Sequence, residues 1–134
     1  MNDNILNDKR IFIVEDDTMN RVVYNITLKR YTQWIEFDRF GRNVITKLIK
    51  THYDLIILDL MLSFGESGFS IFRDIKKLSD YAHVPIVAIS ASEPSVSIPK
   101  AKELGFDGYI TKPIDKNILP KQLACILNGE PVWS

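Results

Sequence analysis

Short runs of apolar residues recur along the chain and alternate with longer segments of mixed polarity. The run Leu55-Ile56-Ile57-Leu58 has the length of a strand, and its lack of polar residues is typical of a strand buried on both faces of a parallel sheet. Residues 34–40 alternate partly between apolar and polar side chains, which also predicts a strand. Strands are therefore predicted at 10–14, 34–40, 55–58, 86–89 and 107–110.

The segments between these strands carry apolar side chains at mostly helical spacing. Pro99 fits the first turn of a helix that begins near Ser97, because the missing N–H costs little there. Pro120 leaves two readings open for the last helix, which either begins near Ile118 or is kinked in its first part. Helices are predicted at about 18–31, 43–51, 69–78, 98–104 and 115–128.

Five strands that alternate with five helices predict an α/β fold, in which right-handed crossovers connect parallel strands. We expect a single five-stranded parallel sheet with helices on both faces and the strand order 2-1-3-4-5, the flavodoxin-like arrangement. Its first and third strands are neighbours, and ligands bind where the strand order reverses. The chain length suits one domain, predicted at 10–128 between a polar leader at 1–9 and a short C-terminal tail at 129–134.

Composition and charge exclude several classes of function. Lysine and arginine total 17 and so do aspartate and glutamate, so the net charge of zero gives no electrostatic case for nucleic acid or an anionic membrane. No apolar run approaches the roughly 20 residues of a membrane-spanning helix. Cys125 is the one cysteine, so no internal disulfide forms and a cytoplasmic location is expected.

Chemically useful side chains follow four of the predicted strands. Glu15, Asp16 and Asp17 follow the first strand, and Asp59 follows the third. Capping of the next helix accounts for Asp17, but it does not account for three consecutive acids that face a fourth. Clustered carboxylates repel one another unless a cation lies between them, and oxygen ligands of this kind suit Mg²⁺ or Mn²⁺. Glu15, Asp16 and Asp59 are therefore candidate metal ligands.

Asp59 is also a candidate nucleophile, because a carboxylate can accept a phosphoryl group. Phosphoryl transfer asks the protein for alignment and charge neutralisation, which a divalent cation and Lys112 would supply. Ser90, at the end of the fourth strand, offers a hydroxyl that can donate to a phosphoryl oxygen. A turn serine and a solvated lysine are the simpler interpretations of these two residues.

These motifs together resemble the receiver domain of two-component response regulators, from about Arg10 to Asn128. The resemblance rests on Ile-Phe-Ile-Val-Glu15-Asp16-Asp17, Leu-Ile-Ile-Leu-Asp59-Leu-Met61, Pro85-Ile-Val-Ala-Ile-Ser90-Ala91 and Gly108-Tyr109-Ile-Thr-Lys112-Pro113. It implies a phosphorylation-dependent signalling switch of a phosphorelay, which catalyses only its own phosphorylation and slow dephosphorylation. The implied partners are a sensor histidine kinase or histidine phosphotransfer protein, a downstream protein target and, in a phosphorylation-dependent homodimer, a second copy of the chain. The zero net charge predicts no nucleic-acid or membrane partner.

The resemblance also assigns roles to residues. Asp59 is implied as the phosphoacceptor and Lys112 as the phosphate-binding cation, before a cis Lys112–Pro113 bond. The backbone carbonyl of Met61 joins the metal ligands, and Ser90 and Tyr109 are the switch residues. The surface that changes is expected on the fourth helix, fifth strand and fifth helix.

One loop departs from the family pattern, and other functions compete with this one. Leu62-Ser63 stands where a proline is usual, and Gly68 lies one residue further from Asp59 than usual, so the loop is expected to be one residue longer. A phosphatase with an Asp nucleophile would need a second acid two residues after Asp59, where Met61 stands. Flavin or nucleotide binding would need glycines after the first strand. A pseudo-receiver that only binds partners is disfavoured by the intact acids, Ser90 and Lys112.

Overall fold

The computed structural model describes residues 3–62 and 67–134 of the chain. Within them, a parallel sheet has the strand order β2-β1-β3-β4-β5-β6. The strands are β1 (Arg10–Val14), β2 (Trp34–Asp38), β3 (Leu55–Leu58), β4 (Ile86–Ser90), β5 (Gly108–Thr111) and β6 (Val132–Trp133). The α-helices are α1 (Thr18–Leu28), α2 (Val44–Lys50), α3 (Gly68–Lys76), α4 (Pro94–Leu104) and α5 (Leu119–Leu127). The predicted fold class and the order 2-1-3-4-5 are confirmed, and β6 adds a short sixth strand.

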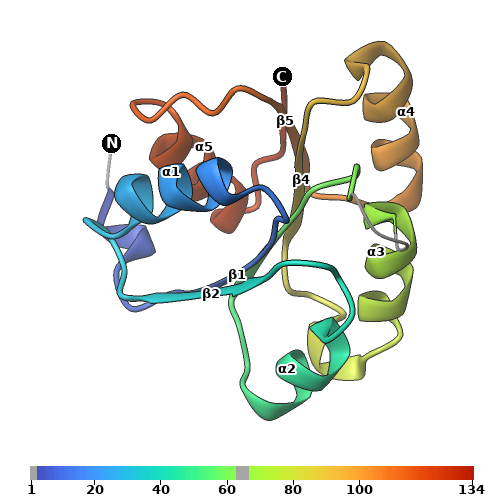
Figure 1. The fold of residues 1–134 in the computed structure, drawn as a ribbon, viewed down its shortest axis with the longest axis horizontal. Coiled ribbons are helices and arrows are strands. Elements are labelled where there is room, and N and C mark those ends of the chain that lie inside the picture. Colours follow the sequence, from blue (N-terminus) through green and yellow to red (C-terminus); the bar gives the residue numbers. More distant parts are fainter. Residues whose placement is uncertain (1–2, 63–66) are drawn as a thin grey trace.

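Helices cover both faces of the sheet, as Figure 1 shows, with α1 and α5 on one side and α2, α3 and α4 on the other. Each face has its own core, because successive side chains of a strand point to opposite faces. Ile11, Ile13 and Ile57 pack with α1 and α5, whereas Phe12 and Ile56 pack with the other three helices. Among the described residues, no helix is long and apolar enough to cross a membrane.

The predicted bounds of the fourth and the first helix need correction. The fourth helix begins at Pro94, not near Ser97, and Pro99 lies inside it. Pro94 lies in the first turn of α4, where the lack of an N–H is tolerated. Pro99 has no N–H to donate to the carbonyl one turn earlier, but this part of the helix is exposed, so water can bond that carbonyl instead. The first helix ends at Leu28, because the N–H groups of Tyr31 and Thr32 turn back onto the carbonyl of Leu28.

The last helix follows one of the two readings of Pro120. It begins at Leu119, which places Pro120 in its first turn, and it ends at Leu127. The chain then turns through Gly129, which has a φ of 86°, and forms β6 within the segment expected to be a tail. At the other end, a 3-10 helix at Asp3–Leu6 lies in the expected polar leader and buries Leu6 completely.

Candidate functional site

The register of the central strands brings the predicted site residues to one edge of the sheet. Val14 of β1 pairs with Leu58 of β3, so Glu15 and Asp59 leave adjacent strands at the same level. The Asp59 N–H donates to the carbonyl of Val14 at 3.1 Å. Ser90 pairs with Thr111 in the same way, and the Lys112 N–H donates to the Ser90 carbonyl at 3.0 Å. The carboxyl ends of β1, β3, β4 and β5 therefore form one site.

Three acids form a cluster at this edge. Carboxylate oxygens of Glu15, Asp16 and Asp59 all lie within 4.8 Å of one another. Glu15 is 1% exposed and Asp59 is 5% exposed, so little water screens their repulsion. This set of oxygen donors fits a hard cation such as Mg²⁺.

Lys112 joins two of these acids. Its Nζ lies 2.8 Å from Glu15 Oε1 and 2.8 Å from Asp59 Oδ2, and both contacts are hydrogen bonds. The Lys112–Pro113 peptide bond is cis, as predicted. The ammonium group therefore compensates part of the negative charge of the acidic cluster.

Burial and pairing shift the ionisation of the buried groups. Burial raises the pKa of Glu15, although the hydrogen bond from Lys112 acts against this. Burial alone would lower the pKa of Lys112, but the hydrogen bonds to Asp59 and Glu15 outweigh it, and the pKa is raised. Lys112 is therefore a fixed positive charge at neutral pH.

The loop after β1 is held by one contact that the sequence predicted and by two, both from Arg21, that it did not. The Asp17 side chain caps α1 by accepting the Asn20 N–H at 2.8 Å, as its simpler interpretation predicted. Arg21 Nη1 donates to the Glu15 carbonyl at 3.1 Å, and Nη2 donates to Thr18 Oγ1 at 3.1 Å. Arg21 thus fixes the backbone that carries the first acid. The sequence signal for this contact is that Arg21 lies in the predicted first helix only six residues after Glu15.

Hydrogen bonds through Ser92 connect the end of β4 to β5 and α4. Ser90 is fully buried, and its Oγ accepts the Ser92 N–H at 3.2 Å. The Tyr109 hydroxyl lies 2.8 Å from Ser92 Oγ and donates to the Ser92 carbonyl at 3.0 Å. Ser97 of α4 donates to Ser92 Oγ at 2.9 Å. Tyr109 is fully buried, and Ser92 and Ser97 extend the predicted pair of switch residues.

The loop after β3 returns closely to Asp59. Met61 is exposed, and its N–H donates to Asp59 Oδ1 at 3.0 Å. A Cβ on Gly68 would clash with the carbonyl oxygen of Asp59 and would meet Leu60 Cα at 2.7 Å. Only glycine therefore allows α3 to begin here. The loop that is expected to be one residue longer includes residues 63–66, which lie outside the described residues.

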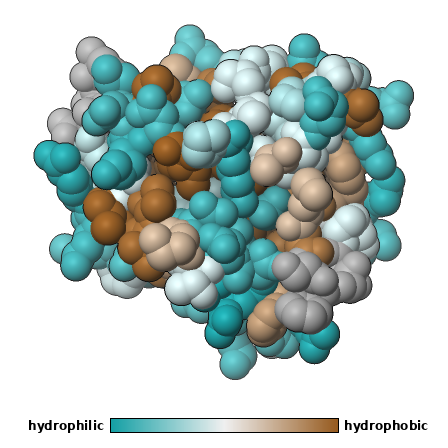
Figure 2. Space-filling model, turned by 45° about the horizontal axis from the view of Figure 1, so that its top comes forward, coloured by the Kyte–Doolittle hydropathy of each residue, from teal (hydrophilic) through white to brown (hydrophobic). Residues whose placement is uncertain are grey.

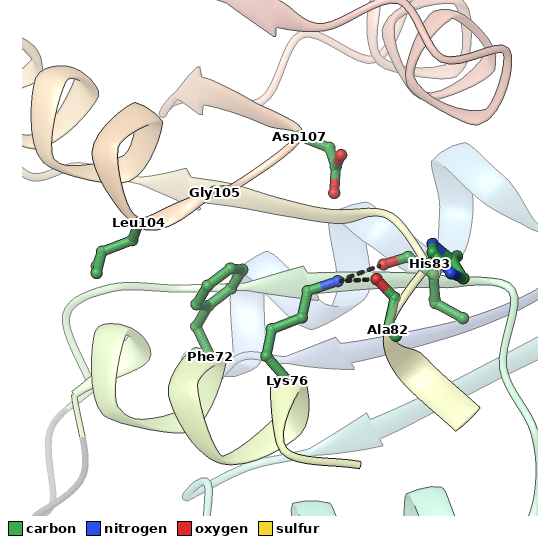
Figure 3. Close-up of a pocket in the computed structure, with 8 residues that line it drawn as sticks. Phe72, Lys76, Ala82, His83, Leu104, Gly105 and Asp107 are labelled. Atoms are coloured by element: carbon green, nitrogen blue, oxygen red, sulfur yellow. Dashed lines mark hydrogen bonds between the residues drawn. The ribbon is translucent and has the colours of Figure 1, made fainter. Parts of the chain in front are cut away.

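A cavity of about 390 Å³ lies beside the segments that lead into β4 and β5, at the other end of the strands from the acidic cluster. Figure 3 shows Lys76 reaching across it toward the backbone near Ala82. Lys76 Nζ donates to the carbonyls of Tyr81, Ala82 and Val84, which use its three protons, and burial lowers its pKa. This lysine therefore closes a turn, and the cavity is separate from the acidic cluster.

Comparison with known proteins agrees with this geometry. Residues 11–124 match the family described as the response regulator receiver domain. The response regulator ArlR of Staphylococcus aureus is 33% identical over 124 residues, which cover 91% of this chain and 54% of that protein. The chain thus spans about half the length of the curated relatives it matches.

Solved structures share the fold. A two-component response regulator of the LuxR family from Aurantimonas sp. SI85-9A1 is 25% identical, with a TM-score of 0.82 over 92% of this chain and 88% of that one. The chemotaxis response regulator CheY4 of Vibrio cholerae is 24% identical, with a TM-score of 0.79 over 88% of this chain and 98% of that one.

Proposed function

The chain belongs to the response regulator receiver domain family, a family of phosphoacceptor signalling modules, and from that membership we propose that Asp59 is its phosphoacceptor. The observation that carries this proposal is the place of Asp59 at the end of β3, among two further acids and 2.8 Å from the Lys112 ammonium. A carboxylate oxygen of Asp59 attacks the phosphorus atom, and the bond from phosphorus to the leaving group breaks with its electron pair. The donor is the phosphorylated histidine of a sensor kinase or phosphotransfer protein.

Glu15, Asp16, Asp59 and the Met61 carbonyl would hold Mg²⁺ or Mn²⁺. Three carboxylates against one ammonium leave two negative charges when all are ionised, which a divalent cation neutralises. The bound cation supplies charge neutralisation at the phosphoryl oxygens. Lys112 and the Ser90 hydroxyl would then bind these oxygens from the other side of the site.

An exposed apolar stripe on α1 supports a helical partner protein. Met19, Val22 and Ile26 are 68%, 43% and 58% exposed and follow helical spacing. Figure 2 shows hydrophobic side chains gathered on the side of the molecule where α1 lies. Because α1 begins directly after the acids, a kinase or phosphotransfer helix on this stripe would bring its histidine to Asp59.

The output would pass through α4, β5 and α5. Ser90 and Lys112 would bond the phosphoryl group. The Ser92 N–H donates to Ser90 Oγ, and the Ser92 hydroxyl contacts both Tyr109 of β5 and Ser97 of α4. Phosphorylation would bias this surface toward a conformation that binds a target protein or a second copy. The zero net charge argues for a protein target rather than a nucleic acid.

Incubation with acetyl phosphate and Mg²⁺, followed by intact mass measurement, tests this function. The wild type should gain one phosphoryl group, and it should gain none when EDTA removes the metal. Asp59→Asn should remain unlabelled, whereas Asp17→Asn, a matched change at the exposed cap of α1, should be labelled as the wild type is. Full labelling of Asp59→Asn would move the acceptor elsewhere.

A further inference from the structure

The C-terminal strand β6 covers the edge of the sheet beside β5. Gly108 pairs with Val132 and Tyr109 with Trp133 in parallel register. The Ser134 N–H donates to the Tyr109 carbonyl at 2.9 Å. Figure 1 shows this end of the chain alongside β5, between α4 and α5. β6 therefore lies in the middle of the surface assigned to output.

Side chains of β6 fasten it to the two flanking helices. Trp133 packs against the core on the α4 side, and Lys102 of α4 lies 5.2 Å from its ring centroid. Val132 packs against the core on the α5 side. A Cβ on Gly108 would lie 2.9 Å from the Val132 carbonyl oxygen and 2.9 Å from Ile126, so glycine permits this close approach. The strand thus connects α4, β5 and α5.

The last residue of the segment holds the strand end that carries Lys112. Both the N–H and the hydroxyl of Thr111 donate to the Ser134 carbonyl, at 3.0 and 2.7 Å. Lys112 follows directly and reaches Glu15 and Asp59. Thr111 bonds to Ser134 and its neighbour Lys112 bonds to the acids, so these two adjacent residues connect β6 with the acidic cluster.

We propose that β6 is a regulatory strap whose docking on β5 opposes phosphorylation of Asp59. This inference rests on the proposed function. A phosphoryl group on Asp59 draws the Lys112 ammonium away from its two carboxylates, and Thr111 moves with it. The two hydrogen bonds from Thr111 to the Ser134 carbonyl already have favourable lengths, so a displacement of Thr111 weakens them. Coupling between two sites is reciprocal, so a weakened strap favours the phosphorylated state equally.

Trp133 can report on the strap. The chain has two tryptophans, and Trp34 lies on β2 at the opposite edge of the sheet. A Trp34→Phe protein therefore carries one tryptophan, on β6. Its emission and its quenching by acrylamide are followed while beryllofluoride, a mimic of the phosphoryl group, is titrated in with Mg²⁺. Amide hydrogen exchange of Thr111 and Ser134 is measured in the same states.

We expect beryllofluoride to increase acrylamide quenching of Trp133 and to speed exchange of both amides. Thr111→Val, which removes one hydrogen bond to Ser134, should tighten beryllofluoride binding by up to about five-fold, the worth of one ordinary hydrogen bond. The matched change Thr46→Val, on the exposed surface of α2, should leave the affinity unchanged.

The outcomes separate the strap from the phosphoacceptor. Binding of beryllofluoride with unchanged Trp133 quenching and an unchanged affinity in Thr111→Val would overturn the strap and leave Asp59 as acceptor. Unprotected Thr111 and Ser134 amides in the free protein would also overturn it, because β6 would not be docked. Absence of both beryllofluoride binding and acetyl phosphate labelling would overturn the proposed function, and the coupling with it.

Discussion

At the scale of single residues, Lys112 contributes to the stability of the site. Its side chain is 11% exposed and bonds to two carboxylates that are 1% and 6% exposed. Removal of one partner from a buried ion pair leaves uncompensated charge, which costs more than the pair itself contributes.

Lys112→Met should therefore lower the free energy of unfolding by about 3 kcal/mol at neutral pH without divalent cations. Urea unfolding in EDTA measures the change. Lys77→Met is the control, because Lys77 is 78% exposed and its contact with Asp74 spans 3.7 Å, so about 0.5 kcal/mol or less is expected. Equal losses in the two variants would contradict the account of a buried cluster.

Tyr24 gives the fold a dependence on alkaline pH. The side chain is fully buried, and burial raises its pKa well above the usual 10.0, with the charges of Glu15 and Asp59 adding to this. The unfolded chain loses this proton near pH 10 and the folded protein retains it. The stabilisation is complete below pH 10 and falls as the pH rises toward the folded pKa.

Between pH 10 and 11, the wild type should therefore lose up to about 1.4 kcal/mol more stability than Tyr24→Phe. The contribution of Lys112, whose pKa is also raised, falls at alkaline pH in both proteins and cancels in the comparison. Urea unfolding at a series of pH values measures both slopes. Parallel slopes would show that Tyr24 ionises equally in the two states.

The sequence predicted the central residues of the site because strand ends expose them. Glu15, Asp59, Ser90 and Lys112 each follow a run that sheet pairing brings to the same edge. Their functional roles remain predictions. The contacts of Arg21 and of the Ser92 and Ser97 hydroxyls were not predicted, because their partners are set by how α1 and α4 pack, which local patterns do not encode.

At the scale of elements, strands were predicted more closely than helix ends. Buried runs such as 55–58 leave little choice of bounds. The start of α4 was misjudged because proline suits the first turn of a helix, and both Pro94 and Pro99 could occupy one. β6 was missed because two residues carry no periodicity, and the strand forms only where Gly108 lets the chain approach β5.

The start of α3 is the element on which the site depends most. Gly68→Ala would place a methyl group against the backbone of Asp59 and Leu60, so Asp59, the proposed acceptor, must shift. We expect a loss of at least about 2 kcal/mol in stability and at least ten-fold slower labelling by acetyl phosphate. Urea unfolding and time-resolved intact mass measure the two effects.

Gly105→Ala is the matched control for this prediction. Gly105 caps α4 with a φ of 103°, so alanine there is strained by about 1 kcal/mol. Gly105 lines the cavity at the other end of the strands from the acidic cluster, so its substitution should not move Asp59 and labelling should keep its wild-type rate. Labelling of Gly105→Ala that is slowed in proportion to its own loss of stability would mean that stability, rather than the position of Asp59, limits the reaction.

At the scale of the whole molecule, the sheet separates two hydrophobic cores and gathers charge at one edge. The strands hold the acids close together despite their repulsion. The free energy gained by burying the apolar side chains of the two cores is far larger than the free energy lost to repulsion at this one site. A cation that binds the native cluster therefore stabilises the entire fold, since the unfolded chain does not hold these carboxylates together.

Mg²⁺ should accordingly raise the free energy of unfolding, by about 1.4 kcal/mol at ten-fold excess over its dissociation constant. Asp16→Asn should lose most of this gain, because it removes one of the three clustered carboxylates. Asp17→Asn should keep it, since that side chain caps α1 and asparagine caps equally well. Thermal unfolding with Mg²⁺ or EDTA measures all three proteins. Equal gains in all of them would place the cation outside the cluster of Glu15, Asp16 and Asp59.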